Sequence, residues 1–308
     1  MSREKDWRGR GNSQMPEGKP LPPGIFRYAA GIEYDGSGYC GWQRQRHCAS
    51  VQQAVEDALS SVAAEPLTAR CAGRTDAGVH ATAQVIHFDT YATRSDDNWL
   101  RGCNANLPRD VRCVWVRGVP AGFHARFSAL ARTYRYIVLN SQDRPALLRH
   151  NLSWEKHSLS IAAMREAAVA LQGEQDFSSF RASGCQSSTS MREVFYIDIF
   201  TLGNMVIFEI CANAFLLHMV RNIVGALLTI GRGERSPGWL GELLAARDRT
   251  QAPATAPAVG LYLVGVDYPL MFKLPEVKPG PVFVGQNFGG GIDRSEKIQS
   301  WQARAKVK

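Results

Sequence analysis

The chain lacks the cysteine patterns that define small crosslinked or zinc-bound proteins. Its seven cysteines are odd in number, scattered between positions 40 and 211, and contain no C-x-x-C pair. This argues against a disulfide scaffold and against a zinc ribbon or finger. The patterns H-E-x-x-H and H-x-E with P-C-x-x-C are also absent, and the histidines are dispersed. No metal site is therefore predicted.

The chain also lacks the apolar segments of a secretory leader or a membrane protein. Residues 1–20 contain no apolar stretch of the kind that a signal peptide requires, so a reducing cytoplasm is the expected compartment. The run 214–230 is nearly long enough to span a bilayer. His218, Arg221 and Asn222 stand at its centre, however, and a charge at mid-bilayer is costly. We expect no membrane association.

The composition is that of a folded, mildly basic protein. The length of 308 residues suggests about two domains, and 45% hydrophobic with 21% charged residues excludes a wholly disordered or fibrous chain. Of the net charge of +8, residues 1–24 contribute +2 (five basic, three acidic) and 271–308 contribute +4 (seven basic, three acidic), which leaves +2 for 25–270. Both tails are predicted to be disordered, so deleting 271–308 should leave the fold intact.

The hydrophobic periodicity predicts the same order of elements twice. In the first half, strands are expected at 26–34, 67–73, 83–89 and 111–119, with helices following Ser50 and Ser95. In the second half, strands are expected at 132–139, 193–201, 205–212 and 261–268, with helices at 160–172, 213–230 and 239–246. The order β-α-β-β-α-β is that of the ferredoxin-like unit. We predict an α+β fold of two such domains, 25–122 and 123–270, with mainly antiparallel sheets side by side and the active-site cleft between them.

A glycine motif near the N-terminus invites a dinucleotide-binding interpretation that its context does not favour. Gly36, Gly38 and Gly41 satisfy G-x-G-x-x-G after a predicted strand. In a dinucleotide site that loop opens directly into a helix, whose N-terminus binds the pyrophosphate. Here the next predicted helix begins only after Ser50. A turn or a binding loop is the better interpretation.

An arginine inside an apolar helix is the most informative physical signal. Arg221 lies within the run 214–230, which is apolar on nearly all sides and therefore predicted to be buried. A guanidinium stays protonated, so its burial without an anion would be costly. We expect a carboxylate to meet it, although a core salt bridge or a snorkelling side chain would explain it equally well.

The best candidate for that carboxylate is Asp76. It belongs to the stretch 71–80, CAGRTDAGVH, which places Arg74, Thr75, Asp76 and His80 between flanking glycines. Glycines let the backbone turn and let a ligand approach closely. The alternative is an ordinary Asp-containing turn between two strands. The density of functional side chains favours a site.

Several motifs together resemble the tRNA pseudouridine synthase A family. GRTDAGVH at 73–80 is similar to its catalytic signature, and four further segments resemble it in family order across about 25–270: 34–45, 123–136, 218–225 and 260–264. Leu217 departs from the pattern, because some members have a second histidine there. The resemblance implies isomerisation of uridine to pseudouridine at positions 38, 39 and 40 of the tRNA anticodon stem-loop. It also implies a homodimer that uses no cofactor and no metal.

The resemblance assigns roles to individual residues. Asp76 is the expected catalytic residue, as nucleophile or as base, and Arg221 supplies the cation beside it. Tyr134 matches the active-site tyrosine, whose ring offers a stacking face for the target base. The target must leave the stem to react, and Arg74 is the candidate for stabilising the extruded nucleotide.

The remaining candidates are weaker and concern RNA contacts. Each has the alternative of being a solvated surface side chain: Gln43, Arg44, Gln45, Arg126, Arg132 and Arg135. His80 and His124 are as consistent with structural hydrogen bonds as with participation, and Trp42 with packing.

Two other functions stay open. A non-catalytic RNA-binding or RNA-chaperone protein on the same scaffold would keep the arginines but would have no need of Asp76. An NAD-type oxidoreductase would rest on the glycine motif alone. Replacing Asp76 with Ala distinguishes the first from the enzyme, and a nicotinamide titration tests the second.

Overall fold

The computed structural model describes residues 21–284, which form five α-helices and ten strands in one sheet. The strands are β1 (Phe26–Tyr34), β2 (Arg70–Cys71), β3 (His80–Thr90), β4 (Val111–Gly118), β5 (Ala131–Asn140), β6 (Ser153–Glu155), β7 (Gly173–Asp176), β8 (Met191–Leu202), β9 (Met205–Ala212) and β10 (Leu261–Asp267). The helices are α1 (Val51–Ala63), α2 (Asp96–Asn106), α3 (Ile161–Ala168), α4 (Met219–Gly231) and α5 (Trp239–Ala246).

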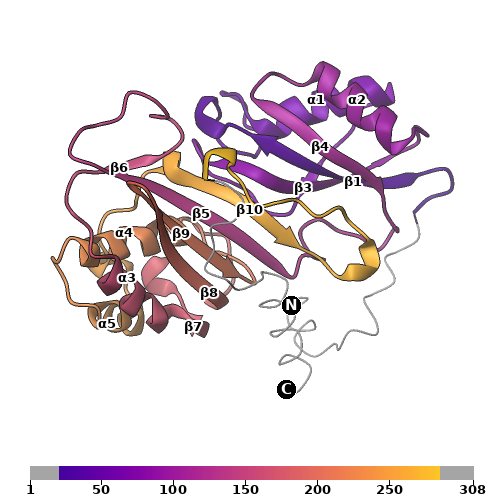
Figure 1. Ribbon diagram of the computed structural model, residues 1–308. Helices are drawn as coiled ribbons and strands as arrows, with labels where there is room; N and C mark the ends of the chain where they lie inside the picture. The colour runs from indigo at the N-terminus through magenta and orange to yellow at the C-terminus, as the bar shows by residue number, and fades with distance from the viewer. Residues whose placement is uncertain (1–20, 285–308) are drawn as a thin grey trace.

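The last strand joins the two halves of the chain at the centre of the sheet. The order is β4-β1-β3-β10-β5-β9-β8-β7, with β2 paired to β3 and β6 to β5. β10 is parallel to β3, where Tyr262 lies opposite His80, and antiparallel to β5 (Figure 1). Apart from β3–β10 and β5–β6, the pairs are antiparallel. The prediction of a mainly antiparallel α+β fold is confirmed, and the sheet is continuous across both halves.

All five helices pack against one face of this sheet. Side chains alternate along a strand, so the even-numbered residues of β1 and β5, such as Tyr28 and Tyr136, point to the same side. They belong to a single core that also contains residues of α1 and α4, such as Leu59 and Ile223. Figure 1 shows α1 and α2 together over one end of the sheet and α3, α4 and α5 together over the other.

The opposite face of the sheet is covered by the end of the described chain. Phe272 is 5% exposed and packs with Phe123, while Val284 is fully buried beside Ile137. The guanidinium of Arg135 donates a hydrogen bond to the carbonyl of Gly280. Residues 271–284 are therefore part of the fold, which corrects the expected tail boundary at 271. The rest of that tail and residues 1–20 lie outside the described residues.

Several predicted elements differ from those observed. The expected helix 213–230 begins only at Met219, because residues 213–218 form a loop that ends with His218 in the left-handed conformation. The expected strand 67–73 is paired only over Arg70–Cys71. The short strands β6 and β7 have three and four residues, too few for a periodic pattern to be recognised.

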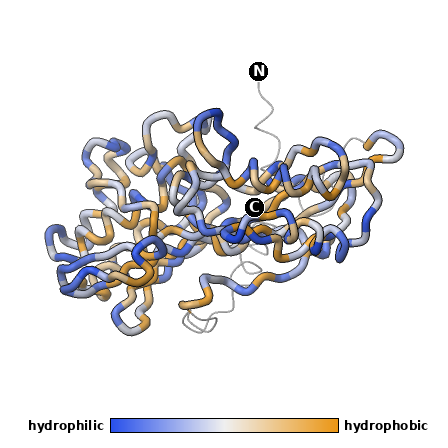
Figure 2. The backbone as a smooth tube through the Cα atoms, turned by 90° about the horizontal axis from the view of Figure 1, so that it is seen from above, coloured by the Kyte–Doolittle hydropathy of each residue, from blue (hydrophilic) through white to orange (hydrophobic). Residues whose placement is uncertain are grey.

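The helices show no membrane-spanning character. Within residues 21–284, no helix is both long and apolar enough to cross a bilayer. Figure 2 shows that hydropathy changes every few residues along much of the chain, as expected for elements with one face toward a core.

Candidate active site

Asp76 lies in the loop that connects β2 to β3. The backbone N–H of Val79 donates to the carbonyl of Asp76 at 3.1 Å, which closes a tight turn. Gly78 adopts a φ of +75° within it, a conformation that glycine adopts without steric cost. The side chain of Asp76 is 29% exposed. The carboxylate is thus within reach of a molecule from solution.

Two buried polar side chains anchor the start of this loop. The hydroxyl groups of Tyr34 and Thr75 lie 2.8 Å apart. The amide of Gln84 donates to the carbonyl of Gly73 at 2.6 Å and accepts from its N–H at 3.4 Å. Burial raises the pKa of Tyr34, so its phenol stays protonated. Because buried polar groups are costly when unpaired, these contacts define the loop geometry.

The glycine motif supports the Asp76 loop from the other side. The N–H of Trp42 donates to the carbonyl of Thr75 at 3.0 Å. A Cβ atom on Gly41 would lie 2.5 Å from that carbonyl oxygen, and one on Gly36 would overlap the carbonyl of Val79. α1 begins only at Val51, so the motif does not open into a helix. The close approach of the two backbones accounts for Gly36 and Gly41.

The start of α4 brings two side chains to the same oxygen of Asp76. Arg221 Nη1 lies 3.7 Å from Asp76 Oδ2, and His218 Nε2 lies 3.4 Å from it. Arg221 Nε also donates to the carbonyl of Ala256 at 2.8 Å. The expected approach of Arg221 to Asp76 is therefore observed. His218 was not among the predicted site residues, although its position three residues before Arg221 puts both near one helix face.

Tyr134 on β5 contributes an aromatic ring to the same region. It is 8% exposed, and its ring meets that of Phe215 edge-on at 5.0 Å between centroids. A Cβ on Gly73 would lie 3.8 Å from the Tyr134 hydroxyl, which places that hydroxyl beside the Asp76 loop. Burial, and then the charge of Asp76, raise the pKa of Tyr134. Phe215 was also missed, because it lies in the segment expected to be helical.

Arg74 is exposed and reaches from the Asp76 loop to the second half of the chain. Its Nη1 donates to Gln186 Oε1 at 3.3 Å. Its guanidinium is thus held near the loop by a single amide, a contact that another acceptor can replace.

The weaker candidates fall into two groups, and four of them are exposed. Gln43, Arg44 and Gln45 follow Trp42 in an exposed loop, where Arg44 lies 3.2 Å from Asp57. A disulfide joins Cys40 to Cys48 at the ends of this loop, a local crosslink that the scattered cysteines did not lead us to expect. Arg126 is exposed and lies over the ring of Phe127 at 5.4 Å.

Arg132 and Arg135 are buried in the protein. Arg132 is 9% exposed and donates to four backbone carbonyls, among them Ala72 and Asn213. Arg135 is 4% exposed and bonds Glu209 at 2.6 Å. Its odd position in β5 directs it to the face opposite Tyr134. A phosphate contact by either residue would require these bonds to break, so neither lies where the sequence interpretation required.

His80 and His124 make structural hydrogen bonds. The N–H of Gly36 donates to His80 Nδ1, and the other ring nitrogen lies 3.1 Å from the carbonyl of Val259. His124 Nδ1 accepts the backbone N–H of Arg126. Burial lowers the pKa of both, to about 4 for His124. Both rings are therefore neutral at neutral pH and accept a backbone N–H at Nδ1, and His80 Nε2 donates to the carbonyl of Val259.

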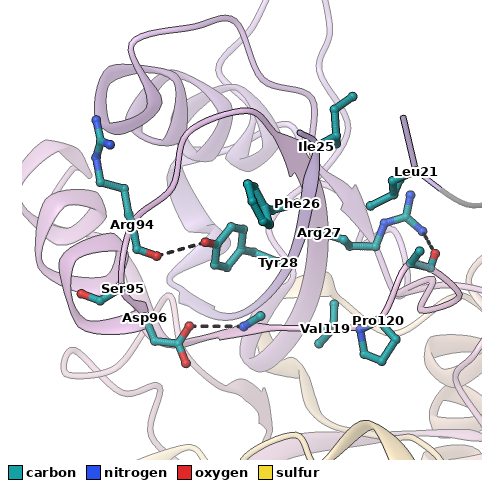
Figure 3. Close-up of a pocket in the computed structure, with 12 residues that line it drawn as sticks. Leu21, Ile25, Phe26, Arg27, Tyr28, Arg94, Ser95, Asp96, Val119 and Pro120 are labelled. Atoms are coloured by element: carbon teal, nitrogen blue, oxygen red, sulfur yellow. Dashed lines mark hydrogen bonds between the residues drawn. The ribbon is translucent and has the colours of Figure 1, made fainter. Parts of the chain in front are cut away.

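A recess of about 520 Å³ lies elsewhere, where β1 begins and β4 ends (Figure 3). Its polar groups already have partners in the protein: Tyr28 donates to the carbonyl of Arg94, and Arg27 pairs with Asp89. It contains none of the residues around Asp76. Over the described residues, no three His, Cys, Asp or Glu side chains are grouped to hold a metal ion.

The family model and the curated relatives agree on one family. A family model described as tRNA pseudouridine synthase matches residues 30–128 and 167–269. A tRNA pseudouridine synthase A from Klebsiella pneumoniae (strain 342) is 55% identical over 260 residues, covering 84% of this chain and 96% of that protein. One from Coxiella burnetii (strain Dugway 5J108-111) is 54% identical over 260 residues and is covered completely. A solved Cbf5-Nop10-Gar1 complex aligns with a TM-score of only 0.32 at 14% identity over 77% of this chain and 48% of that one.

Proposed function

The chain belongs to the tRNA pseudouridine synthase family and isomerises uridine to pseudouridine in tRNA, and on that premise we propose that Asp76 is the catalytic carboxylate. The observation that carries the proposal is the meeting of three elements at one point. A partly exposed carboxylate on the β2–β3 loop lies beside a guanidinium from α4 and near a tyrosine ring from β5.

The reaction requires one bond to break and one to form at the same sugar carbon. The bond between C1′ and N1 of the uracil breaks, the base turns, and C1′ bonds to C5. The proton on C5 is lost, and N1 gains one. Asp76 serves this sequence as a nucleophile or as a base for the C5 proton. Arg221 offsets the charge of the carboxylate in either case.

Tyr134 and Arg74 are proposed to handle the extruded base. A uridine inside a stem must leave the stack before its C1′ can be reached. The ring of Tyr134 supplies a flat surface for it, and the raised pKa keeps the phenol protonated. Arg74 is exposed and lies two residues before Asp76. Its guanidinium leaves Gln186 and contacts the extruded nucleotide or fills the space that the nucleotide leaves in the stem.

The finer substrate and assembly assignments rest on the family resemblance. We propose that the target uridines are at positions 38, 39 and 40 of the anticodon stem-loop and that the active protein is a cytoplasmic homodimer. The exposed side chains near the site are the proposed RNA contacts, namely Gln43, Arg44, Gln45 and Arg126.

We also propose that the two halves, 25–122 and 123–270, are ferredoxin-like units with the site between them. Two observations support this. The strand order β4-β1-β3-β2 of the first half has the same pattern as β10-β5-β9-β8 of the second. The residues around Asp76 also come from both halves.

The test is pseudouridine mapping on a tRNA transcript incubated with the wild-type protein, Asp76→Ala, and Asp97→Asn as a control. Asp97 is an exposed carboxylate on α2 that pairs only with Arg101 among the described residues. Asp76→Ala should lower the rate by orders of magnitude while the Kd for tRNA stays within a few-fold, and Asp97→Asn should match the wild type. Full activity of Asp76→Ala would remove Asp76 from the mechanism. Tight tRNA binding without any pseudouridine from the wild type would favour the RNA-binding alternative.

A further inference from the structure

His218 adopts a backbone conformation that its place in the fold does not explain. Its φ is +60° and its ψ +7°, in the left-handed region, at the residue that precedes α4. Residues before a helix are normally extended, and their side chains accept a hydrogen bond from the first turn. His218 makes no such bond. A strained residue that does not cap its helix points to another role for the side chain.

The conformation brings the imidazole to Asp76. His218 Nε2 lies 3.4 Å from Asp76 Oδ2, the same oxygen that Arg221 Nη1 approaches at 3.7 Å. Both contacts from the α4 side are closest at Oδ2, and among the described residues no hydrogen bond engages Oδ1 of Asp76. The carboxylate is therefore held by one oxygen from the α4 side, and the other is left to face a substrate.

We propose that His218 is a positioning residue which, together with Arg221, holds Oδ2 of Asp76 so that Oδ1 is presented to the uridine. This inference rests on the proposed function and adds a residue to it. His218 does not touch the reacting atoms in this arrangement. It acts by restricting the rotation of the Asp76 carboxylate, and a carboxylate that must attack or deprotonate at a defined angle depends on that restriction.

The imidazole acts in its neutral form. Burial lowers the pKa of His218, and the carboxylate of Asp76 raises it in part. Arg221 and Arg249 are the cations that face it, and both oppose its protonation. A neutral imidazole with its proton on Nε2 places a polar N–H group 3.4 Å from Oδ2 without cancelling the negative charge that the reaction uses.

His218→Gly separates positioning from a structural role. Glycine adopts the left-handed conformation without strain, so the variant should fold with an unchanged or higher Tm. The kcat should fall by about 10- to 100-fold, with KM within about 3-fold. Added imidazole should restore part of kcat, and His218→Gln, which keeps an N–H donor, should exceed His218→Gly. Leu148→Gly is the matched control, because Leu148 has a φ of +57° and is exposed on another loop.

A second measurement does not depend on activity. NMR titration of the His218 ring in the wild type and in Asp76→Asn should show a lower His218 pKa in the variant, because the carboxylate that favours the charged ring is gone. Unchanged titration would overturn the inference even if the protein makes no pseudouridine. Wild-type kcat in His218→Gly would also overturn it, as would a loss of kcat that neither imidazole nor Gln restores.

Discussion

Gly41 offers a sharp test of how the Asp76 loop is positioned. In Gly41→Ala the new Cβ would lie 2.5 Å from the carbonyl oxygen of Thr75 and 2.9 Å from the carbonyl carbon of Asp76. Both neighbours are backbone atoms, so no side-chain rotation relieves the overlap. The glycine loop and the Asp76 loop must move apart.

The expected size of the effect follows from this geometry. Ordinary van der Waals contact begins at 3.4 Å, so the backbones must separate by 3.4 − 2.5 = 0.9 Å. Misplacing catalytic groups by about 1 Å costs about 100-fold in rate, or about 2.7 kcal/mol in the barrier. The φ of +95° at Gly41 adds about 1–2 kcal/mol of strain for any other residue. We expect kcat to fall about 100-fold and stability to fall by about 1–3 kcal/mol.

The assay is single-turnover pseudouridine formation together with urea unfolding, with Gly38→Ala as the matched control. Gly38 belongs to the same motif, yet a Cβ there would meet nothing closer than Asp110 at 4.0 Å. Gly38→Ala should therefore leave kcat and stability within about 2-fold and about 0.5 kcal/mol. If Gly38→Ala is as damaging as Gly41→Ala, or if Gly41→Ala retains full kcat, the glycines do not act through the Asp76 loop.

Three further predictions test other parts of the molecule. Tyr134→Phe should keep KM within about 3-fold, because the ring and its contact with Phe215 remain. Tyr134→Ala should raise KM about 10-fold through lost base stacking, and equal KM values in the two variants would argue against stacking. Burial lowers the pKa of His87 to about 3. Between pH 6.5 and 3 the unfolded chain therefore binds a proton that the folded chain does not. The free energy of unfolding should decrease as the pH is lowered through that window, by up to about 1.4 kcal/mol per pH unit. His87→Gln should reduce this slope in urea unfolding at pH 7 and pH 5, and an unchanged slope would contradict the assignment. Ending the chain after 284 keeps Phe272 and Val284 and gives the reference Tm. Ending it after 270 removes Phe272 and Val284, each worth about 1.5–3 kcal/mol of burial, and an unaltered Tm there would show that this segment adds no stability.

The regular elements were predictable where the pattern of buried residues is local. The alternation from Phe26 to Tyr34 matches the observed strand, and Ser50 accepts from the N–H of Gln53 as the capping-box spacing predicts. The approach of Arg221 to Asp76 was predictable for a different reason. A charge within an apolar helix needs a partner, and the sequence offered one suitable carboxylate among flanking glycines.

The loop before α4 was not predictable in the same way. Residues 213–218 are as apolar as the helix that follows, so hydropathy does not show where the helix begins. The left-handed conformation of His218 was not predictable either, because histidine adopts it more often than most residues but still only in a small minority of cases. Phe215 and His218 were missed for this reason.

The residues that support the loop were hidden by their separation along the chain. Tyr34 and Thr75 are 41 residues apart, and the glycine contacts join segments with no shared periodicity. Arg132 and Arg135 were predicted to contact RNA, but the structure buries both side chains. Their charge suggests an exposed surface, but both lie in a strand with neighbours on either side and find backbone carbonyls or Glu209 in the interior.

The central position of β10 has a consequence for how the protein is made. This strand is translated after nearly everything else that the site requires, yet it is the strand that bridges β3 and β5. A nascent chain that stops short of residue 261 contains Asp76, Tyr134 and Arg221 but has no backbone ladder to hold its halves in register. We therefore expect prematurely terminated chains to form no pseudouridine, and the site to assemble only after residues 261–267 have been synthesised.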